Sequence, residues 1–258
     1  MSVQTAPFYH TFPDILYATS PKLNQALAYD ESQHLHQVVT NKDNLEVLTA
    51  LHEQCLSSYP HAGKAYAAIR TWRQLFWQPV YLAIVSVHAL NHTIDTAKLR
   101  QSVKQGSIYG YQLAPSCPAQ SQNTLDSNIV YTATQLRKLI DSLFVELSYI
   151  AKVPRRTAYG LVADCTLNGL ILLPKILISC SHTQIRTWGI AWLEALGLSG
   201  ASALMKIITK HNESRLILDR KTCCMHYLND PKNLCITCPK QKRQTRIERA
   251  IAKENVIT

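Results

Sequence analysis

Cys223-Cys224, ten further residues and then Cys235-Ile236-Thr237-Cys238-Pro239 form the stretch around which this chain of 258 residues is organised. Four of its eight cysteines fall within these sixteen residues. Thiolates this close in sequence can converge on one metal centre without help from a distant part of the fold. The stretch therefore predicts a metal-binding module near the C-terminus, with the rest of the chain as its platform.

The spacing of the four cysteines leaves three interpretations open. Structural zinc sites commonly use two C-x-x-C pairs, and only Cys235 and Cys238 have that spacing. The adjacent Cys223 and Cys224 are awkward for one tetrahedral ion, because neighbouring side chains diverge in a helix or a strand. A [2Fe–2S] cluster suits them better, since its four ligands need not meet at a single atom. The third interpretation is four reduced thiols without a metal, and the spacing places iron–sulfur slightly ahead of zinc.

The composition indicates a folded protein with reduced thiols. Hydrophobic residues make up 47% of the chain, which is enough for a sizeable core. The first twenty residues lack the basic and apolar segments of a secretory signal. No apolar run approaches the roughly 20 residues that span a bilayer, so we expect no transmembrane segment. We therefore expect a cytoplasmic protein, free or peripheral to the inner membrane, in which metal binding explains clustered cysteines better than disulfides do.

The formal net charge of +10 is consistent with nucleic acid, an anionic membrane surface or anionic small molecules as partners. The densest basic patch follows the cysteines and comprises Lys240, Lys242, Arg243, Arg246 and Arg249. An ordinary solvated helix face would have the same pattern. The charge alone therefore does not decide between these partners.

Hydrophobic periodicity predicts a mainly α protein with a small β element (α+β), in which a helical body precedes a short C-terminal cysteine-rich iron–sulfur module. Helices are expected at about 23–39, 43–57, 64–90 (as two helices or as one helix kinked at Pro79), 132–153, 157–173, 183–196, 201–211 and 241–254. A β-hairpin is expected within 93–113, a polar loop from 115 to 128 and a strand at 215–219. Three parts follow: an N-terminal helical, substrate-binding part (1–130), a helical core (131–214) and the C-terminal module with its basic helix (215–258).

A few polar residues within the predicted helices suggest further roles. Arg70 and Arg73 lie between aromatic residues, where arginines can line an anion site or simply pair on a surface. Asp164 and Asn168 are four residues apart on one helix face, and we expect them to bond each other rather than to face a pocket. Among the remaining cysteines, those that fall in apolar surroundings are expected to be core thiols: Cys55, Cys165 and Cys180.

The segment from Arg215 to Tyr227, with Cys235-Ile236-Thr237-Cys238-Pro239 after it, resembles the C-terminal signature of FhuF-type ferric siderophore reductases. That family carries a C-C-x10-C-x2-C motif that holds a [2Fe–2S] cluster, and all four cysteines here match it in type and spacing. Residues Tyr66 to Tyr81, with Trp77-Gln78-Pro79, are more weakly similar to the family's N-terminal helical region. The resemblance implies that Cys223, Cys224, Cys235 and Cys238 are the cluster ligands, and His226 lies among them as a neighbour.

The resemblance also implies an activity, namely one-electron reduction of a ferric siderophore to release Fe(II). Such an enzyme needs an exposed redox centre and a cationic cradle for an anionic complex. Basic residues near the cluster in sequence, or after Pro154, are the candidates for that cradle: Arg155, Arg156, Arg220, Lys221 and Lys240. The sequence has no G-x-G-x-x-G signature for a nicotinamide cofactor, so a ferredoxin-like or flavoprotein electron donor is expected.

Two rival functions remain at this stage. A zinc-stabilised nucleic-acid-binding protein would explain the basic patch, but it would not explain the adjacent cysteines. An iron–sulfur electron-transfer or sensor protein would explain the cysteines without any siderophore activity. Of these three functions we favour the reductase, and we expect no nucleic acid as a partner.

Overall fold

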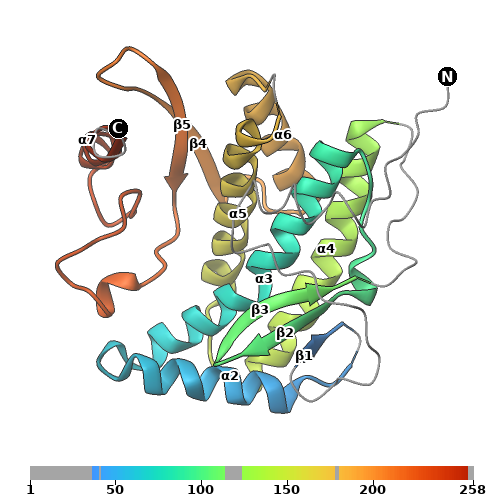
Figure 1. Ribbon diagram of the computed structural model, residues 1–258. Helices are drawn as coiled ribbons and strands as arrows, with labels where there is room; N and C mark the ends of the chain where they lie inside the picture. The colour runs from blue at the N-terminus through green and yellow to red at the C-terminus, as the bar shows by residue number, and fades with distance from the viewer. Residues whose placement is uncertain (1–36, 41, 114–123, 178–179, 255–258) are drawn as a thin grey trace.

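Helix α3 (Gly63–Leu90) is the central element of the computed structural model, which describes residues 37–40, 42–113, 124–177 and 180–254. Its apolar stripe includes Ile69, Trp72, Leu75 and Phe76, all of them buried. Other helices pack around α3, and two small antiparallel sheets complete the fold (Figure 1). The predicted mainly α class with a small β element is confirmed.

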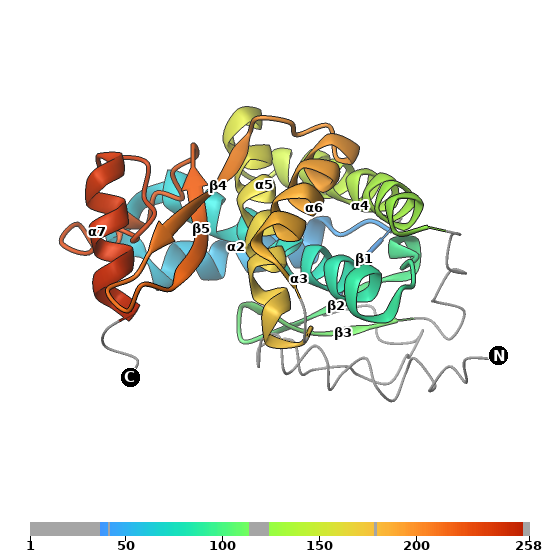
Figure 2. The same cartoon turned by 90° about the horizontal axis from the view of Figure 1, so that it is seen from above.

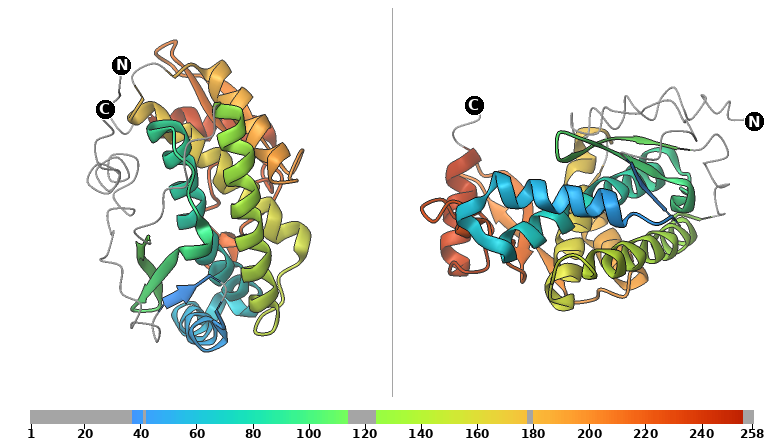
Figure 3. Two further views of the ribbon diagram at one scale, coloured as in Figure 1. Left: turned by 90° about the vertical axis from the view of Figure 1, so that its right-hand side faces the viewer. Right: turned by 90° about the horizontal axis from the view of Figure 1, so that it is seen from below.

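Helix α3 packs against α2 (Leu45–Ser58), α4 (Leu125–Ser148) and α5 (Arg155–Leu172). Helix α6 (His182–Ala195) packs against α4 and α5, and α7 (Arg243–Glu254) packs against β4. The strands are β1 (Gln37–Val39), β2 (Arg100–Lys104), β3 (Ser107–Gln112), β4 (Ser202–Ile208) and β5 (Ser214–Arg220). Seen from above, β4, β5 and α7 gather on one side of the molecule, next to α5 (Figure 2). Seen from below, α2 and the start of α3 extend towards these C-terminal elements (Figure 3).

Helix α3 continues through Pro79, where the sequence predicts either two helices or one kinked helix, so the two-helix alternative is wrong. Proline has no N–H group and therefore leaves the carbonyl four residues earlier without its helical partner. That carbonyl belongs to Leu75, and it accepts a hydrogen bond from the Gln101 side chain of β2 at 3.0 Å. The neighbouring sheet thus supplies the donor that the proline lacks, and one helix of 28 residues results.

The predicted hairpin is present as β2 and β3, and β1 extends it to a three-stranded antiparallel sheet. Gln105 and Gly106 both have positive φ values, as a tight two-residue hairpin turn requires. Strand β1 occupies residues 37–39, where the end of a helix was predicted. Residues 23–36 of that predicted helix lie outside the described residues, as does Cys117.

Helix α4 begins earlier and ends earlier than its periodicity suggests. Thr124 accepts a hydrogen bond from the Ser127 backbone, and the Ser127 side chain accepts one from Thr124 in return. This capping box starts the helix at Leu125, inside the predicted polar loop. Helices α2, α5, α6 and α7 lie within two residues of their predicted limits.

The predicted helix at 201–211 is wrong, because these residues form β4 and pair with β5 along its whole length. A short apolar run fits a helix or a strand equally well, and only its partner decides between them. The strand predicted at 215–219 is confirmed as β5. The β4–β5 hairpin spans the predicted boundary at residue 214, and the division into three parts stays a prediction.

Among the described residues, one stretch, Arg155–Lys175, is long and apolar enough to cross a membrane. The sequence predicts no apolar run of this length, and this helix is the exception. Within the fold, 67% of its apolar window is buried against other parts of the protein, as in the core helix of a folded domain. The length and apolar composition of α5 therefore reflect its position in the core, where it packs against α3 and α6.

The interaction between Gln101 and Leu75 makes a prediction for stability. Gln101→Met leaves the Leu75 carbonyl buried without a donor, which should lower the free energy of unfolding by about 1–3 kcal/mol. In a Pro79→Ala background the N–H restored at position 79 can pair with the Leu75 carbonyl. Gln101→Met should then lower the free energy of unfolding clearly less. Urea unfolding of the two single variants and the double variant measures the coupling. Equal costs in both backgrounds would contradict this account of the proline.

Candidate metal centre and adjoining pocket

The four cysteines lie on the loop between β5 and α7, which packs against α5. Thr222 precedes the first cysteine and sits so close to α5 that a Cβ atom added at Gly160 would lie 2.0 Å from its hydroxyl oxygen. The loop also contacts α3, because the Tyr66 hydroxyl lies 3.0 Å from Nδ1 of His226. The absence of a side chain at Gly160 therefore lets the cysteine loop approach the helical body.

Helix α7 holds the other side of the loop. Arg246 pairs with Asp219 of β5 at 2.9 Å and is almost fully buried. Arg249 donates a hydrogen bond to the Leu234 carbonyl at 2.8 Å, and Gln241 donates one to the Cys235 carbonyl at 2.7 Å. Two of the five residues of the predicted basic patch thus point inwards and fix the backbone around the cysteines.

The four thiols are free and lie as two pairs. The sulfurs of Cys224 and Cys235 are 3.5 Å apart. Cys238 is a neighbour of Cys223, and burial together with the nearby Cys238 and Cys224 raises the pKa of the Cys223 thiol. Cys224 and Cys238 are buried, whereas their partners are half-buried. In the part of the chain that the structure describes, no three His, Cys, Asp or Glu side chains gather around one point that could hold a metal ion. Paired thiols suit a binuclear cluster, in which the ligands are shared between two irons, better than one tetrahedral ion.

The thiols of Cys224 and Cys235 differ in acidity. A hydrogen bond from the Cys235 thiol lowers the pKa of Cys224, and the Arg220 guanidinium adds to this effect. The same hydrogen bond raises the pKa of Cys235. The pair therefore loses its first proton more easily than an isolated thiol does, and a metal that takes both sulfurs as ligands displaces the remaining proton.

Arg220 joins the cysteine loop to α5. Its Nε lies 2.7 Å from Asp164 Oδ2, and both side chains are largely buried. Its Nη1 lies 3.8 Å from the sulfur of Cys224. Ser202 of β4 donates a hydrogen bond to the other Asp164 oxygen at 2.6 Å. Burial raises the pKa of Asp164, and the charge of Arg220 together with the two hydrogen-bond donors opposes this shift.

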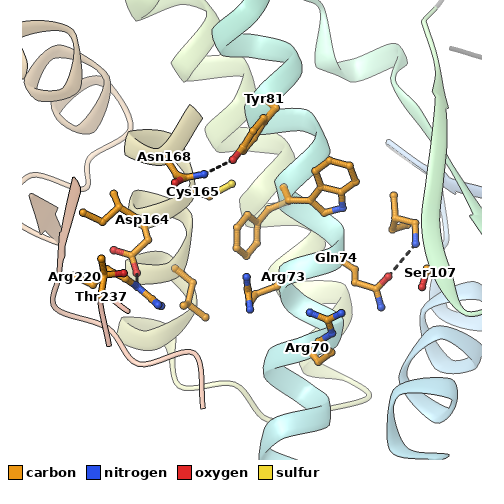
Figure 4. A pocket seen from close by; sticks show the side chains of 15 residues that line it. Arg70, Arg73, Gln74, Tyr81, Ser107, Asp164, Cys165, Asn168, Arg220 and Thr237 are labelled. Carbon is orange, nitrogen blue, oxygen red and sulfur yellow. Dashed lines mark hydrogen bonds and ion pairs between the residues drawn. The ribbon is translucent and has the colours of Figure 1, made fainter. Parts of the chain in front are cut away.

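An open pocket of about 540 Å³ lies beside the cysteine loop, between α3 and α5. Arg220 and Thr237 line it, and Thr237 stands between Cys235 and Cys238 in the sequence. The remaining polar groups come mostly from the two helices, as Figure 4 shows: Arg70, Arg73, Gln74 and Tyr81 from α3, Asp164, Cys165 and Asn168 from α5, and Ser107 from β3. The pocket and the cysteine loop therefore share a wall.

Of the five basic residues proposed from the sequence as a cradle, only Arg220 lines this pocket. Lys221 is exposed and donates a hydrogen bond to the Gly200 carbonyl at 2.7 Å. Lys240 lies over the Tyr227 ring and Arg155 over the Tyr159 ring, while Arg156 is exposed at the start of α5. Proximity in sequence to the cysteines therefore identified one residue that lines the pocket, Arg220.

The other charged groups of the pocket could be identified only in part from the sequence. Arg70 and Arg73 stood out because they lie among aromatic residues, and they line the pocket. The expectation that Asp164 and Asn168 bond each other is wrong. Asp164 pairs with Arg220, and Asn168 donates a hydrogen bond to the Tyr81 hydroxyl. Cys165 also lines the pocket, where burial raises its pKa to about 12.

Paired thiols in a loop held by a buried arginine define a C-terminal iron–sulfur module. Residues 220–240 match the family model of the FhuF 2Fe-2S C-terminal domain, which spans all four cysteines. The chain therefore carries a FhuF-type 2Fe–2S C-terminal domain, and its cofactor is a [2Fe–2S] cluster. No solved structure matches the chain.

The contact between Gly160 and Thr222 predicts the effect of one added methyl group. Gly160→Ala should push the loop away from α5, destabilise the protein by about 1–3 kcal/mol and lower the iron and acid-labile sulfide bound per chain. Gly169→Ala, in the same helix, is the matched control, because its new Cβ meets only the flexible end of Ile84. Equal iron content in both variants would show that the close approach does not position the cysteines.

Arg220 should tune the cluster as well as hold the loop. Arg220→Gln leaves Asp164 buried without its partner, at a cost of about 3–5 kcal/mol, whereas Arg220→Gln with Asp164→Asn removes both charges. Both variants should have a lower reduction potential, because a cationic donor is lost next to the Cys224 sulfur. Redox titration of the visible spectrum measures this, with Lys221→Gln as the control for charge. An unchanged potential in the double variant would rule out the tuning.

Proposed function

We propose that this protein is a ferric siderophore reductase, which transfers one electron to a bound Fe(III) chelate and so releases Fe(II). The observation that carries the proposal is the arginine-lined pocket, which shares Thr237 with the cysteine loop and whose Arg220 contacts the Cys224 sulfur. The FhuF family is associated with ferric siderophore reduction, and the domain match covers the cysteine loop alone. The pocket adds what the domain match lacks, namely a place for a substrate beside the redox centre.

The cofactor supplies the redox chemistry. Cys223, Cys224, Cys235 and Cys238 would hold the [2Fe–2S] cluster, which would supply one-electron redox chemistry. Fe(III) in a siderophore is bound by hard anionic oxygens, and one electron lowers the charge of the iron and weakens those bonds. The balanced step converts one Fe(III) chelate and one electron into Fe(II) and the free chelator. No acid or base is needed, so the residues of the chain bind and orient.

The size of the pocket fits a small-molecule complex. Ligand pockets are typically about 300–1,000 Å³, and the 540 Å³ here lies within that range. Phe76, Trp77, Leu161 and Leu218 supply apolar surface, and the arginines and amides supply polar contacts. This mixture suits a chelate that has an organic framework around a charged centre.

The electron must come from a separate one-electron donor, for which we propose a ferredoxin-like protein or a flavoprotein. Exposed cations remain next to the cysteine loop at Lys240 and Lys242, even though Arg246 points inwards. A positive rim steers an acidic donor towards the cluster. A cytoplasmic location would place the protein with such donors and keep its thiols reduced.

The rival functions make different predictions. Nucleic-acid binding through α7 is disfavoured, because Arg246 and Arg249 are used to hold the cysteine loop. An electron-transfer or sensor protein would carry the same cluster, but it would have no use for a pocket of three arginines beside it. Release of Fe(II) from a ferric chelate therefore separates the reductase from the sensor.

The proposed function is tested with protein purified without oxygen. It should be reddish, bleach on reduction with dithionite and, once reduced, release Fe(II) from a ferric siderophore into a coloured ferrous chelator. Cys224→Ser should abolish both the colour and the release, because a buried ligand is lost. Cys180→Ser, which changes a thiol outside the loop, should keep both. A colourless protein with one zinc per chain, or a red protein that releases no Fe(II), would refute the reductase.

A further inference from the structure

Two arginines of α3 stand apart from the other charged groups of the pocket. Arg70 and Arg73 are three residues apart and therefore lie on the same face of the helix. Both line the pocket and both are half-buried. Figure 4 shows their guanidinium groups next to one another, across the pocket from Asp164 and Arg220. They form a cationic pair within one cavity.

The charges of the pocket do not cancel. The lining residues include three arginines and one carboxylate, that of Asp164. Arg220 takes up this carboxylate in a 2.7 Å ion pair, which leaves Arg70 and Arg73 as the unbalanced charges. Among the described residues neither of them has a carboxylate partner, and the Arg70 guanidinium lies only over the Tyr59 ring, at 5.8 Å. An excess of two positive charges therefore faces the pocket.

The neutral polar groups nearby are already in use. Gln74 accepts a hydrogen bond from the Ile108 backbone at 3.0 Å, and Asn168 donates one to Tyr81. A ligand that enters the pocket therefore meets two guanidinium groups to which no carboxylate of the described residues is bound. Guanidinium groups bind carboxylates through two parallel hydrogen bonds, and they do so best in partly buried sites.

We infer that Arg70 and Arg73 bind carboxylates on the rim of the ferric chelate, so that the protein selects carboxylate-bearing, anionic chelates over neutral ones. This inference rests on the proposed function for the reaction, but the binding step can be tested without it. Arg220 stays with Asp164 and the cysteine loop and does not serve the ligand. The arginines that bind the chelate thus come from α3, whereas the five cradle residues proposed from the sequence come from α5, β5 and the cysteine loop.

Binding is tested first with a redox-inert probe. Ga(III) citrate has the charge and shape of an anionic ferric chelate and accepts no electron from the cluster. The holoprotein should bind it in calorimetry, and Arg70→Gln with Arg73→Gln should raise its Kd about tenfold or more, because two charge-assisted contacts are lost. Arg70→Lys with Arg73→Lys keeps both positive charges but loses the paired hydrogen bonds of the guanidinium groups, so this variant should have an intermediate Kd. Arg186→Gln, on the exposed side of α6, should bind like the wild type.

Steady-state reduction then tests selectivity. The double glutamine variant should show a KM about tenfold higher for ferric citrate in excess citrate, with kcat within about twofold of the wild type. For a neutral ferric trihydroxamate its KM should stay within about twofold. The iron content and the visible spectrum of the variant should equal those of the wild type, which checks that the cluster is intact.

The outcomes separate the two proposals. Equal changes in KM for both chelates, or no change in Kd for Ga(III) citrate, would overturn the role of Arg70 and Arg73 while leaving the reductase in place. Binding of Ga(III) citrate that depends on the arginines, with no Fe(II) released from any chelate by the wild type, would refute the reductase and leave an anion site.

Discussion

The ion pair between Arg220 and Asp164 is the interaction on which the functional part of the molecule depends. It joins β5 to α5 at 2.7 Å, in a setting where both side chains are largely buried. A buried charge without a partner is costly, so neither residue can be lost alone. Because Arg220 also reaches the sulfur of Cys224, the same guanidinium group fixes the loop, faces the pocket and sets the charge beside the cluster.

The net charge of +10 is distributed by the fold among different tasks. Arg246 and Arg249 of α7 hold the backbone of the cysteine loop, and Arg220 pairs with Asp164. Arg70 and Arg73 remain as an unbalanced pair in the pocket. A basic composition alone suggests a polyanion as partner, but a charge that is paired inside the protein is not available to one. The location of each arginine therefore matters more than their number.

The cluster module and the helical body have separate parts in the proposed reaction. The module is defined by local sequence, since all four cysteines lie within one loop between β5 and α7. The pocket draws its walls from α3 and α5, which bring residues about 100 positions apart in sequence to one cavity. This arrangement lets the helical body choose the substrate without altering the cluster ligands.

The sequence alone determined the features that local patterns can encode. The adjacent cysteines and the C-x-x-C spacing identified the [2Fe–2S] module, and apolar periodicity predicted most of the helices and the strand β5. The sequence did not determine the secondary structure of residues 201–211, because a short apolar run becomes a strand only when a partner such as β5 is present. Nor did it show that α3 continues through Pro79, where the Gln101 side chain donates the hydrogen bond that the proline lacks.

Only the tertiary structure decided which charges act together. Arg70 and Arg73 were visible in the sequence as arginines among aromatic residues, but nothing local showed that α5 and β5 would close a pocket over them. Asp164 was predicted to bond Asn168, its neighbour on the helix, yet it pairs with Arg220, 56 residues away. Spacing along the chain can show which ligands reach one metal centre, whereas a pocket exists only once separate helices pack, and that packing depends on the whole core.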